Sequence, residues 1–378
     1  MMIYFDNAAT TKPYDEVIEE MSYSMKNYFG NPSSPHKLGM MAEKKLNYSR
    51  EVIGRAINAS KEEIIFTSGG SESNNFFLRG FIRPEGHLIT TEIEHSSVLK
   101  TCKILESQGI RVTYLKVNNR GLIDLEELKN ALTKDTFLVS IIHVNNEIGS
   151  IQPIEEIGKI IKYHGRAKFH VDATQGFGKV SIDVKKCNVD LLSASGHKIH
   201  GPRGIGIAYM KRGLTPIPLI AGGGQELGLR AGTENLPAAL ALGKATEIIT
   251  SQLKENYKKV SEIKEYFINK INHIEKLSIN SPLSEDISPY ILNLSFKGTR
   301  GEVFLHLLEE KDIYVSTASA CSSKDKKYSH VLKAIGLSED YIEGTLRFSF
   351  NEFSTKEEVD ETIGVIEASL KFLRRLKR

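Results

Sequence analysis

The sequence predicts an α/β fold: a large domain in which helices sandwich a mostly parallel mixed sheet, together with a smaller α+β domain. Between about residues 60 and 210, short runs rich in β-branched residues alternate with helical patterns. That alternation is typical of parallel strands joined by crossover helices. The chain has 378 residues, more than the roughly 250–300 at which a single core usually stops growing, so we expect two domains.

Each expected strand of the sheet is a short apolar run bounded by polar or turn-forming residues. In chain order the runs are residues 64–67, 87–90, 112–115, 137–144, 169–171 and 191–193.

A helical pattern of more than thirty residues, 237–271, follows this region and is expected to connect the domains. Pro237 lies at its start, where a missing N–H is tolerated. We assign residues 14–255 to the large domain, and residues 1–13 and 256–378 to the small one. The small domain should contain strands near 291–295 and 345–350, a helix near 302–310 and a closing helix from residue 356.

The composition is that of a soluble globular protein, with 40% hydrophobic and 26% charged residues and a net charge of +3. It does not call for nucleic acid as a partner, since the only basic block is the short tail 374–378. No stretch approaches the ~18 apolar residues of a membrane helix and no leader pattern is visible, so we expect a cytoplasmic protein. Its three cysteines, Cys102, Cys187 and Cys321, are far apart, which predicts neither disulfides nor a zinc site.

The first chemical motif is the segment 67–74, Thr-Ser-Gly-Gly-Ser-Glu-Ser-Asn, between an apolar strand and a helical run. Free N–H groups at a helix start, with glycines and hydroxyls, form a seat for phosphate. A serine-rich cap before an ordinary helix has a similar pattern. The spacing fits neither a Walker loop nor a dinucleotide fingerprint.

Two further motifs follow strands. Asp172 ends the run 169–172, on the side where open α/β sheets bind ligands, although a turn or cap aspartate would have the same pattern. Lys198 lies in Ser-Gly-His-Lys-Ile-His-Gly-Pro, an unusual setting for a solvated amine. His197 and His200 have no further ligands nearby, so no resident metal is expected.

In chain order these motifs supply a phosphate seat, a carboxylate for a pyridinium nitrogen and a lysine for an aldehyde. Pyridoxal phosphate requires those three groups of a protein. Two other residues follow strands in positions to contribute: His95, whose ring could stack on the pyridine, and Asn146. For each of them alone, a structural hydrogen bond is an equally good interpretation.

With these motifs in order, the sequence resembles the cysteine desulfurases, a family of the class V aminotransferase-like, fold-type I pyridoxal-phosphate enzymes. The resemblance runs from the N-terminal segment to the last helix. The matching blocks are residues 4–11, 30–34, 67–74, 143–149, 170–175, 195–201, 230–235 and 319–323.

The resemblance implies a role for each matching position. Lys198 would form the Schiff base, Asp172 would bind the pyridinium nitrogen, and His95 would stack on the ring with a part in catalysis. Gln175 and Asn146 would lie near the ring hydroxyl and the substrate. The residues expected to hold the phosphate are Gly70, Ser71, Ser195, His197 and, from the other subunit of a homodimer, Thr233.

The same resemblance makes Arg347 the clamp for the substrate carboxylate, a task that suits a planar guanidinium. Cys321 would be the nucleophile that takes sulfur from cysteine. A polar, lysine-containing segment follows it, and we expect an exposed loop at about 318–330 of the length found in the branch that passes sulfur to other proteins. Ala318 departs from the glycine common in the family, which puts the mobility of this loop in question.

The expected activity is therefore conversion of L-cysteine to L-alanine, with a persulfide on Cys321 for iron–sulfur cluster assembly or for thiolation of tRNA or cofactors. The partners would be a second copy of the chain and a sulfur acceptor or iron–sulfur scaffold, with Cys321 as a transient cluster ligand in that complex. Two alternatives remain open: a lyase for selenocysteine or another β-substituted amino acid, and a scaffold that binds sulfur carriers without turnover.

Overall fold

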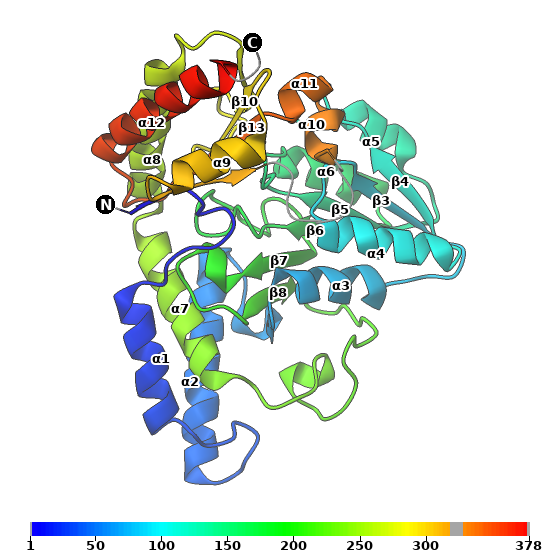
Figure 1. The fold of residues 1–378 in the computed structure, drawn as a ribbon. Coiled ribbons are helices and arrows are strands. Elements are labelled where there is room, and N and C mark those ends of the chain that lie inside the picture. The colour runs from blue at the N-terminus through cyan, green and yellow to red at the C-terminus, as the bar shows by residue number, and fades with distance from the viewer. Residues whose placement is uncertain (1, 318–327, 376–378) are drawn as a thin grey trace.

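The computed structural model describes residues 2–317 and 328–375 of the chain. A seven-stranded sheet runs through the larger part of the molecule in the order β2-β8-β7-β6-β5-β3-β4 (Figure 1). Its strands are β2 (Ile64–Thr67), β3 (His87–Thr91), β4 (Arg111–Leu115), β5 (Thr136–Ile142), β6 (Lys168–Asp172), β7 (Leu191–Ser195) and β8 (Gly206–Met210).

Only β8 runs against its neighbours in this sheet, pairing antiparallel with both β2 and β7. The other pairs are parallel. The predicted mostly parallel mixed sheet is therefore confirmed, and the six expected strands are all present with ends shifted by at most two residues. β8 was not among them, although the apolar run after the Gly204 turn (φ +77°) was a usable signal.

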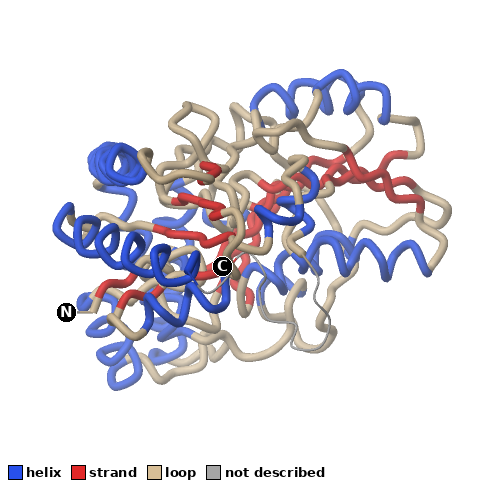
Figure 2. The backbone as a smooth tube through the Cα atoms, turned by 45° about the horizontal axis from the view of Figure 1, so that its top comes forward, coloured by secondary structure: helices blue, strands red, loops and turns tan. Residues whose placement is uncertain are grey.

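Helices cover both faces of the sheet, and Figure 2 shows them on either side of the band of strands. Successive side chains of a strand point to opposite faces of the sheet. In β2, Phe66 packs in the core beneath one helical layer and Ile65 in the core beneath the other. The first layer consists of α1 (Asp15–Asn27), α2 (Lys37–Ala56), α5 (Leu125–Ala131), α6 (Ile154–His164) and α7 (Leu236–Ser251). The second consists of α3 (Gly70–Gly80) and α4 (Ser96–Ser107).

The smaller part is built on a four-stranded antiparallel sheet of order β12-β13-β10-β9, beside a parallel pair of β1 and β11. These strands are β1 (Ile3–Tyr4), β9 (Leu277–Ile279), β10 (Ile291–Phe296), β11 (Ile313–Tyr314), β12 (Ser316–Thr317) and β13 (Thr345–Ser349). The helices are α8 (Leu253–Ile271), α9 (Gly301–Glu309), α10 (His330–Ala334), α11 (Glu339–Ile342) and α12 (Lys356–Arg375). Short 3₁₀ turns occupy η1 (Lys61–Glu63), η2 (Gly196–Lys198) and η3 (Glu226–Gly228).

Three of the four hydrophobic cores follow the same division of the chain, whereas the fourth joins Ile93, Ile142 and Ile148 to apolar residues of α10 and α11. Ile3 and Phe5 pack with apolar residues from Val260 to Leu373 in one core, and the two cores of the large sheet draw on residues 14–249. This distribution supports the assignment of residues 14–255 to one domain and of 1–13 and 256–378 to the other, which we keep as a proposal.

The expected connector over 237–271 is helical except at one residue, and it consists of two helices. The break falls at Gln252 (φ −117°, ψ 15°), between α7 and α8. The packing partners change at this point, because α7 packs on α1 and α2 whereas α8 packs on α12. A sequence pattern records only that both segments have helical periodicity, not that they face different cores.

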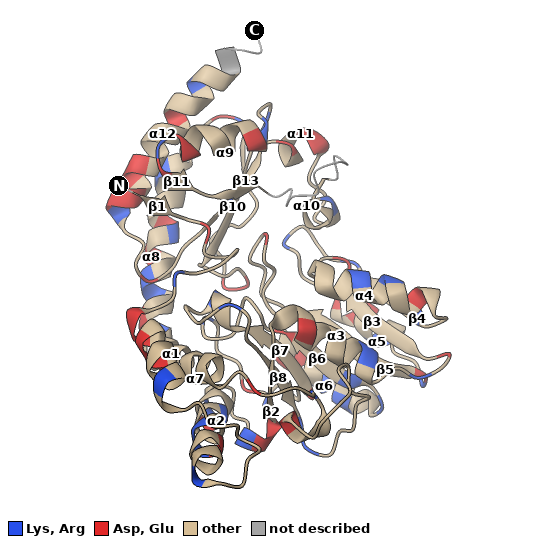
Figure 3. Cartoon of the chain, turned by 60° about the horizontal axis from the view of Figure 1, so that its bottom comes forward, with Lys and Arg blue, Asp and Glu red and all other residues tan. Residues whose placement is uncertain are grey.

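Basic and acidic residues are interspersed along the helices in Figure 3. Within the described ranges, no helix has the length and apolar character needed to cross a membrane.

Candidate active site

The predicted site residues meet at the carboxyl ends of the central strands, where open α/β sheets bind ligands. Asp172 is the last residue of β6, and Ser195 is the last residue of β7. The N-terminal segment crosses this edge: Thr11 donates its backbone N–H and its hydroxyl to the carbonyl of His197, both at 2.9 Å. The N-terminal segment therefore lies against the turn that follows β7.

Lys198 ends the short 3₁₀ turn η2 that follows β7. Its Nζ donates to the carbonyl oxygens of Ala8 at 2.6 Å and Ala9 at 2.7 Å. Burial lowers the pKa of this amine from 10.5 to about 7, assisted by the charges of Lys179 and Arg347 and opposed by Asp6 and Asp172. A lysine with this pKa supplies an unprotonated amine near neutral pH, as a nucleophile requires.

Asp172 and His95 are joined by two intervening side chains. Asn74 Nδ2 donates to Asp172 Oδ2 at 2.7 Å and to Ser97 Oγ at 2.8 Å, and Ser97 Oγ lies 2.8 Å from His95 Nδ1. The pKa of His95 is lowered because the surrounding protein displaces water from its ring, although part of the residue remains exposed. The structure thus brings the expected pyridinium partner and the expected stacking ring into one network.

Gln175 lies next to Lys198, because its Nε2 donates at 2.8 Å to the Ala8 carbonyl that also accepts from the lysine. The side-chain amide of Gln175 is therefore held toward the N-terminal segment, beside the Lys198 amine.

The expected phosphate seat is the start of α3. The N–H groups of Gly70 and Ser71 have no acceptor in the described part of the chain, as is normal for the first turn of a helix. A side chain at Gly70 would lie 2.7 Å from Thr174 Oγ1 and 3.7 Å from Ser195 Cβ, so glycine keeps this approach open. His197 lies nearby, with Nδ1 3.2 Å from Thr10 Oγ1, and burial lowers its pKa to about 4.

These residues fit pyridoxal phosphate. They provide a glycine-lined helix start with free N–H groups, a buried carboxylate and a half-buried amine of lowered pKa, the three groups that the cofactor's phosphate, ring nitrogen and aldehyde need.

Arg347, on β13, joins the two parts of the molecule. Its Nη1 donates to the Asn146 carbonyl and its Nη2 to Asp6 Oδ1, both at 2.9 Å. Nε is buried and has no partner among the described residues, and the whole residue is 9% exposed. These two contacts use two of the five N–H groups of the guanidinium, so a buried Arg347 still has donors for a further anion.

Two predicted residues are not part of this cluster as the structure describes it. Thr233 is exposed, and no contact of its side chain with the other site residues is seen. Cys321 and Ala318 lie outside the described residues. Cys102 and Cys187 are buried, and burial raises the pKa of the Cys102 thiol to about 12, which argues against a role for it as a nucleophile.

Several contributors were not predicted from the sequence. Asn74 was seen only as the end of a serine-rich motif, and Asp6 and Lys179 were not considered. Lys179 is 4% exposed, and burial lowers the pKa of its amine to about 8. A sequence does not show which buried polar residues meet, so the roles of Asn74, Asp6 and Lys179 could not be seen from it.

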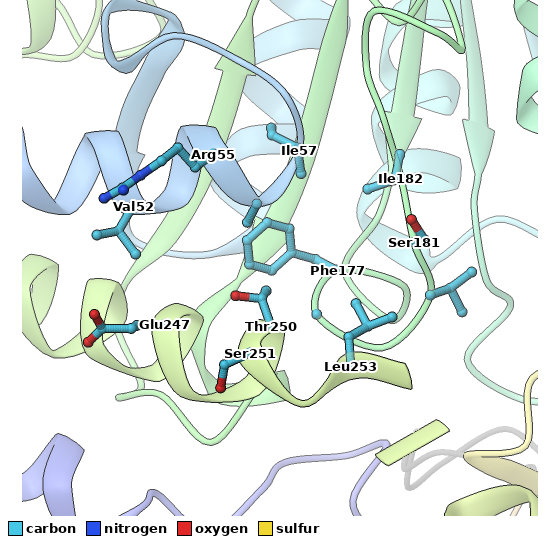
Figure 4. A pocket seen from close by; sticks show the side chains of 13 residues that line it. Val52, Arg55, Ile57, Phe177, Ser181, Ile182, Glu247, Thr250, Ser251 and Leu253 are labelled. Carbon is cyan, nitrogen blue, oxygen red and sulfur yellow. The ribbon is translucent and has the colours of Figure 1, made fainter. Parts of the chain in front are cut away.

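A separate cavity of about 450 Å³ lies between α2, residues 177–182 and the end of α7 (Figure 4). Arg55 and Glu247 are its charged lining residues, and none of the predicted site residues that the structure describes lines it. The cluster around Lys198 is therefore the better candidate for catalysis.

Known proteins resemble the chain over almost its whole length. The cysteine desulfurase IscS of Methanosarcina thermophila is 43% identical, over 99% of this chain and 93% of the relative. The solved structure of a NifS-like protein has a TM-score of 0.93 and 39% identity, covering 98% of this chain and all of the other. SspA in complex with cysteine has a TM-score of 0.82 and 39% identity, covering 93% of this chain and all of SspA.

A model of the family described as aminotransferase class-V matches residues 3–362. The match includes all three described sheets and every described residue of the cluster around Lys198. The chain therefore belongs to the aminotransferase class-V family.

Proposed function

We propose that this chain is a pyridoxal-phosphate-dependent cysteine desulfurase, which converts L-cysteine to L-alanine and retains the sulfur as a persulfide. The observation that carries the proposal is the cluster in which a lysine of lowered pKa, a buried carboxylate and a buried arginine meet at one edge of the sheet. Full-length relatives named cysteine desulfurase and a neighbour solved with cysteine support the choice of substrate.

Lys198 would hold the cofactor's aldehyde, Asp172 its ring nitrogen, and His95 one face of its ring. The phosphate would lie at Gly70, Ser71, Ser195 and His197. When bound, pyridoxal phosphate supplies an electron sink for the bonds at the α-carbon of an amino acid.

Arg347 would bind the substrate carboxylate and so place the α-carbon near Lys198, with Asn146 beside it. The contacts to Asp6 and Asn146 leave Nε–H and the second N–H of each terminal nitrogen for this task. The Lys198 amine would then be the base for the α-proton, and its pKa of about 7 leaves a large fraction of it unprotonated near neutral pH.

Cys321 would take the sulfur. Its thiolate attacks the sulfur atom of the substrate, the substrate's carbon–sulfur bond breaks, and a sulfur–sulfur bond forms. The β-carbon takes up a proton to become a methyl group. One enzyme thiol and one L-cysteine thus give one enzyme persulfide and one L-alanine, and no external oxidant or reductant is needed.

A second copy of the chain would complete the site by bringing its Thr233 to the phosphate. Large apolar side chains on and between α1 and α2 support a homodimer, since Phe29 is 73% exposed, Met25 63% and Met40 61%. The exposed position of Thr233 also suits a contact across an interface.

The persulfide would pass to a sulfur acceptor or an iron–sulfur scaffold protein in the cytoplasm, for cluster assembly or for thiolation of tRNA or cofactors. Cys321 would act as a transient cluster ligand in the scaffold complex. The name IscS shared by several relatives supports cluster assembly.

Replacement of the nucleophile tests the proposal. The Cys321→Ala variant should form no alanine from cysteine while keeping the yellow bound cofactor, and Cys187→Ala should behave as the wild type because that thiol is buried. Alanine production by Cys321→Ala at the wild-type rate would contradict the assignment.

A further inference from the structure

The hydrogen-bond donors around His95 define which of its ring nitrogens carries hydrogen. The backbone N–H of Ser97 points at His95 Nδ1 at 3.2 Å. A backbone N–H can only donate, so Nδ1 has to be an acceptor without hydrogen. The Ser97 hydroxyl, 2.8 Å from the same nitrogen, must therefore also be a donor to it.

The side-chain N–H groups of Asn74 fix the donors and acceptors in the next part of the network. With its own hydrogen directed to His95, Ser97 Oγ accepts from Asn74 Nδ2 at 2.8 Å. The same Nδ2 donates to Asp172 Oδ2 at 2.7 Å, while Asp172 Oδ1 accepts from the backbone N–H of Thr174 at 3.0 Å. Both carboxyl oxygens of Asp172 therefore act as acceptors, which is the pattern of the ionised form.

The orientation of the Asn74 amide leaves one buried oxygen without a hydrogen-bond donor among the described residues, yet it remains the more favourable of the two possible orientations. Asn74 is 1% exposed, and its Oδ1 has no donor in the described part of the chain. A buried carbonyl oxygen without a donor is unfavourable. Turning the amide over would give that oxygen a contact, but it would then face the carboxylate of Asp172. The two Nδ2 contacts therefore decide the orientation.

We infer that Asn74 and Ser97 are positioning residues, which hold Asp172 as an acceptor-only carboxylate and keep the hydrogen of a neutral His95 on Nε2. No partner of Nε2 is seen among the residues the structure describes. His95 would therefore offer a donor to the group in front of it, whereas its acceptor nitrogen is used within the protein.

These hydrogen positions belong to the protein itself, whether or not it converts cysteine to alanine. Their use in catalysis rests on the proposed function: a ring that stacks on pyridoxal phosphate with Nε2–H outward can donate to the substrate but cannot accept from it. Asn74 would at the same time keep Asp172 ready for a protonated ring nitrogen.

Nitrogen-15 NMR of histidine-labelled protein tests the inference, with the His95 signals assigned by their loss in His95→Gln. In the wild type His95 should show the Nε2–H tautomer. Ser97→Ala should shift the tautomer ratio toward Nδ1–H by about tenfold, as expected for loss of one hydrogen bond. Ser97→Thr, which keeps the hydroxyl, should restore the wild-type ratio.

Ser96→Ala is the matched control, since Ser96 is an exposed neighbour in the same helical turn, and it should leave the His95 spectrum unchanged. Asn74→Ala should weaken equilibrium binding of pyridoxal phosphate by about tenfold or more, the usual effect of removing a supporting hydrogen bond from a site ligand. If Asn74→Ala does not fold, the variants Ser97→Ala, Ser97→Thr and Ser96→Ala still test the position of the His95 hydrogen.

Hydrogen on Nδ1 in the wild type, or a Ser97→Ala spectrum identical to that of the wild type, would overturn the inference. A wild-type protein that makes no alanine from cysteine, yet has His95 hydrogen on Nε2, would instead overturn the proposed function and leave the inference standing.

Discussion

Lys198 shows how the surroundings of one residue prepare its chemistry. The residue is half-buried, its amine donates to two carbonyl oxygens, and the buried amine of Lys179 lowers its pKa further. Neutral carbonyls accept hydrogen bonds without adding the negative charge that would hold the extra proton. The site therefore keeps a lysine that can be an unprotonated base near neutral pH.

This pKa predicts how uptake of the cofactor depends on pH. Since only the unprotonated amine attacks an aldehyde and its pKa is about 7, the rate at which cofactor-free protein binds pyridoxal phosphate should rise with pH through a midpoint near 7. Stopped-flow absorbance measures the rate. Lys179→Met, which removes a neighbouring positive charge, should move the midpoint upward. A wild-type midpoint close to the ordinary lysine value of 10.5 would contradict this account of the amine.

Arg347 predicts a separation of KM from kcat. Lysine has one ammonium group and cannot reproduce the contacts to Asp6 and Asn146 while also binding a carboxylate. Arg347→Lys should raise KM for cysteine by about 10–100-fold, the usual loss for a charged hydrogen bond, with a smaller effect on kcat. Steady-state kinetics check this, with Arg79→Lys on the exposed side of α3 as the control. An unchanged KM would exclude Arg347 as the carboxylate clamp.

The site residues that could be predicted from the sequence are those that belong to a recognisable motif. Lys198, Asp172 and the start of α3 each follow an apolar strand, and the structure places them together. Asn74 and Ser97 could not be predicted, because their role depends on α3 and α4 lying side by side in space. Motif spacing reports neighbours along the chain, whereas these contacts join residues 74, 97 and 172.

Among the elements, short apolar strands were the easiest to predict, since each of the six expected runs is a strand of the large sheet. β8 was missed although it is fully buried, and the helical pattern of the connector did not show that it consists of two helices. The reason is shared by both cases. A uniformly apolar run or a continuous helical period is compatible with several arrangements, and tertiary packing selects one.

Helix α8 places a lysine, Lys264, in the protein interior, where hydrophobic residues are usual. Lys264 is 1% exposed, its Nζ donates to the Ser288 carbonyl at 3.1 Å, and burial lowers its pKa to about 7. Lys264→Met should raise the free energy of unfolding at pH 7 by about 1–3 kcal/mol, since a hydrophobic residue of similar volume avoids burial of an ammonium group. Urea denaturation measures the change.

The gain from Lys264→Met should shrink as pH rises. The folded pKa lies below the unfolded value of 10.5, so between about 7 and 10.5 the unfolded wild type binds more protons and its stability increases with pH. Lys258→Met, on the exposed face of the same helix, should change little. A destabilised Lys264→Met variant would show that the ammonium group has a required partner.

For the whole molecule, one buried cluster ties the two parts together beside the site. His200 follows Lys198 by two residues at φ +58°, and it stacks on Tyr14 with ring centroids 4.5 Å apart. Glu352, from the small part, accepts from the Tyr14 hydroxyl and lies 3.5 Å from His200 Nε2. The backbone that carries Lys198 is thus held by residues of both parts.

The proposed homodimer predicts a coupled loss of assembly and activity. Phe29→Asp combined with Met40→Asp places two charges in the exposed apolar surface of α1, α2 and the segment between them, and should convert the dimer to monomers. Light scattering gives the mass. Activity should fall with it, since Thr233 would no longer reach a partner's phosphate site. Tyr163→Asp, at a residue 97% exposed on α6, is the control. A double variant that remains dimeric would place the interface elsewhere.

The central claim is that Lys198 is the amine that holds the cofactor. Borohydride reduction of the protein with bound pyridoxal phosphate, followed by peptide mass spectrometry, identifies that lysine directly. We predict that the label is found on Lys198 and that the nearby buried amine of Lys179 remains unlabelled. Labelling of Lys179, or of no lysine in this cluster, would contradict the account.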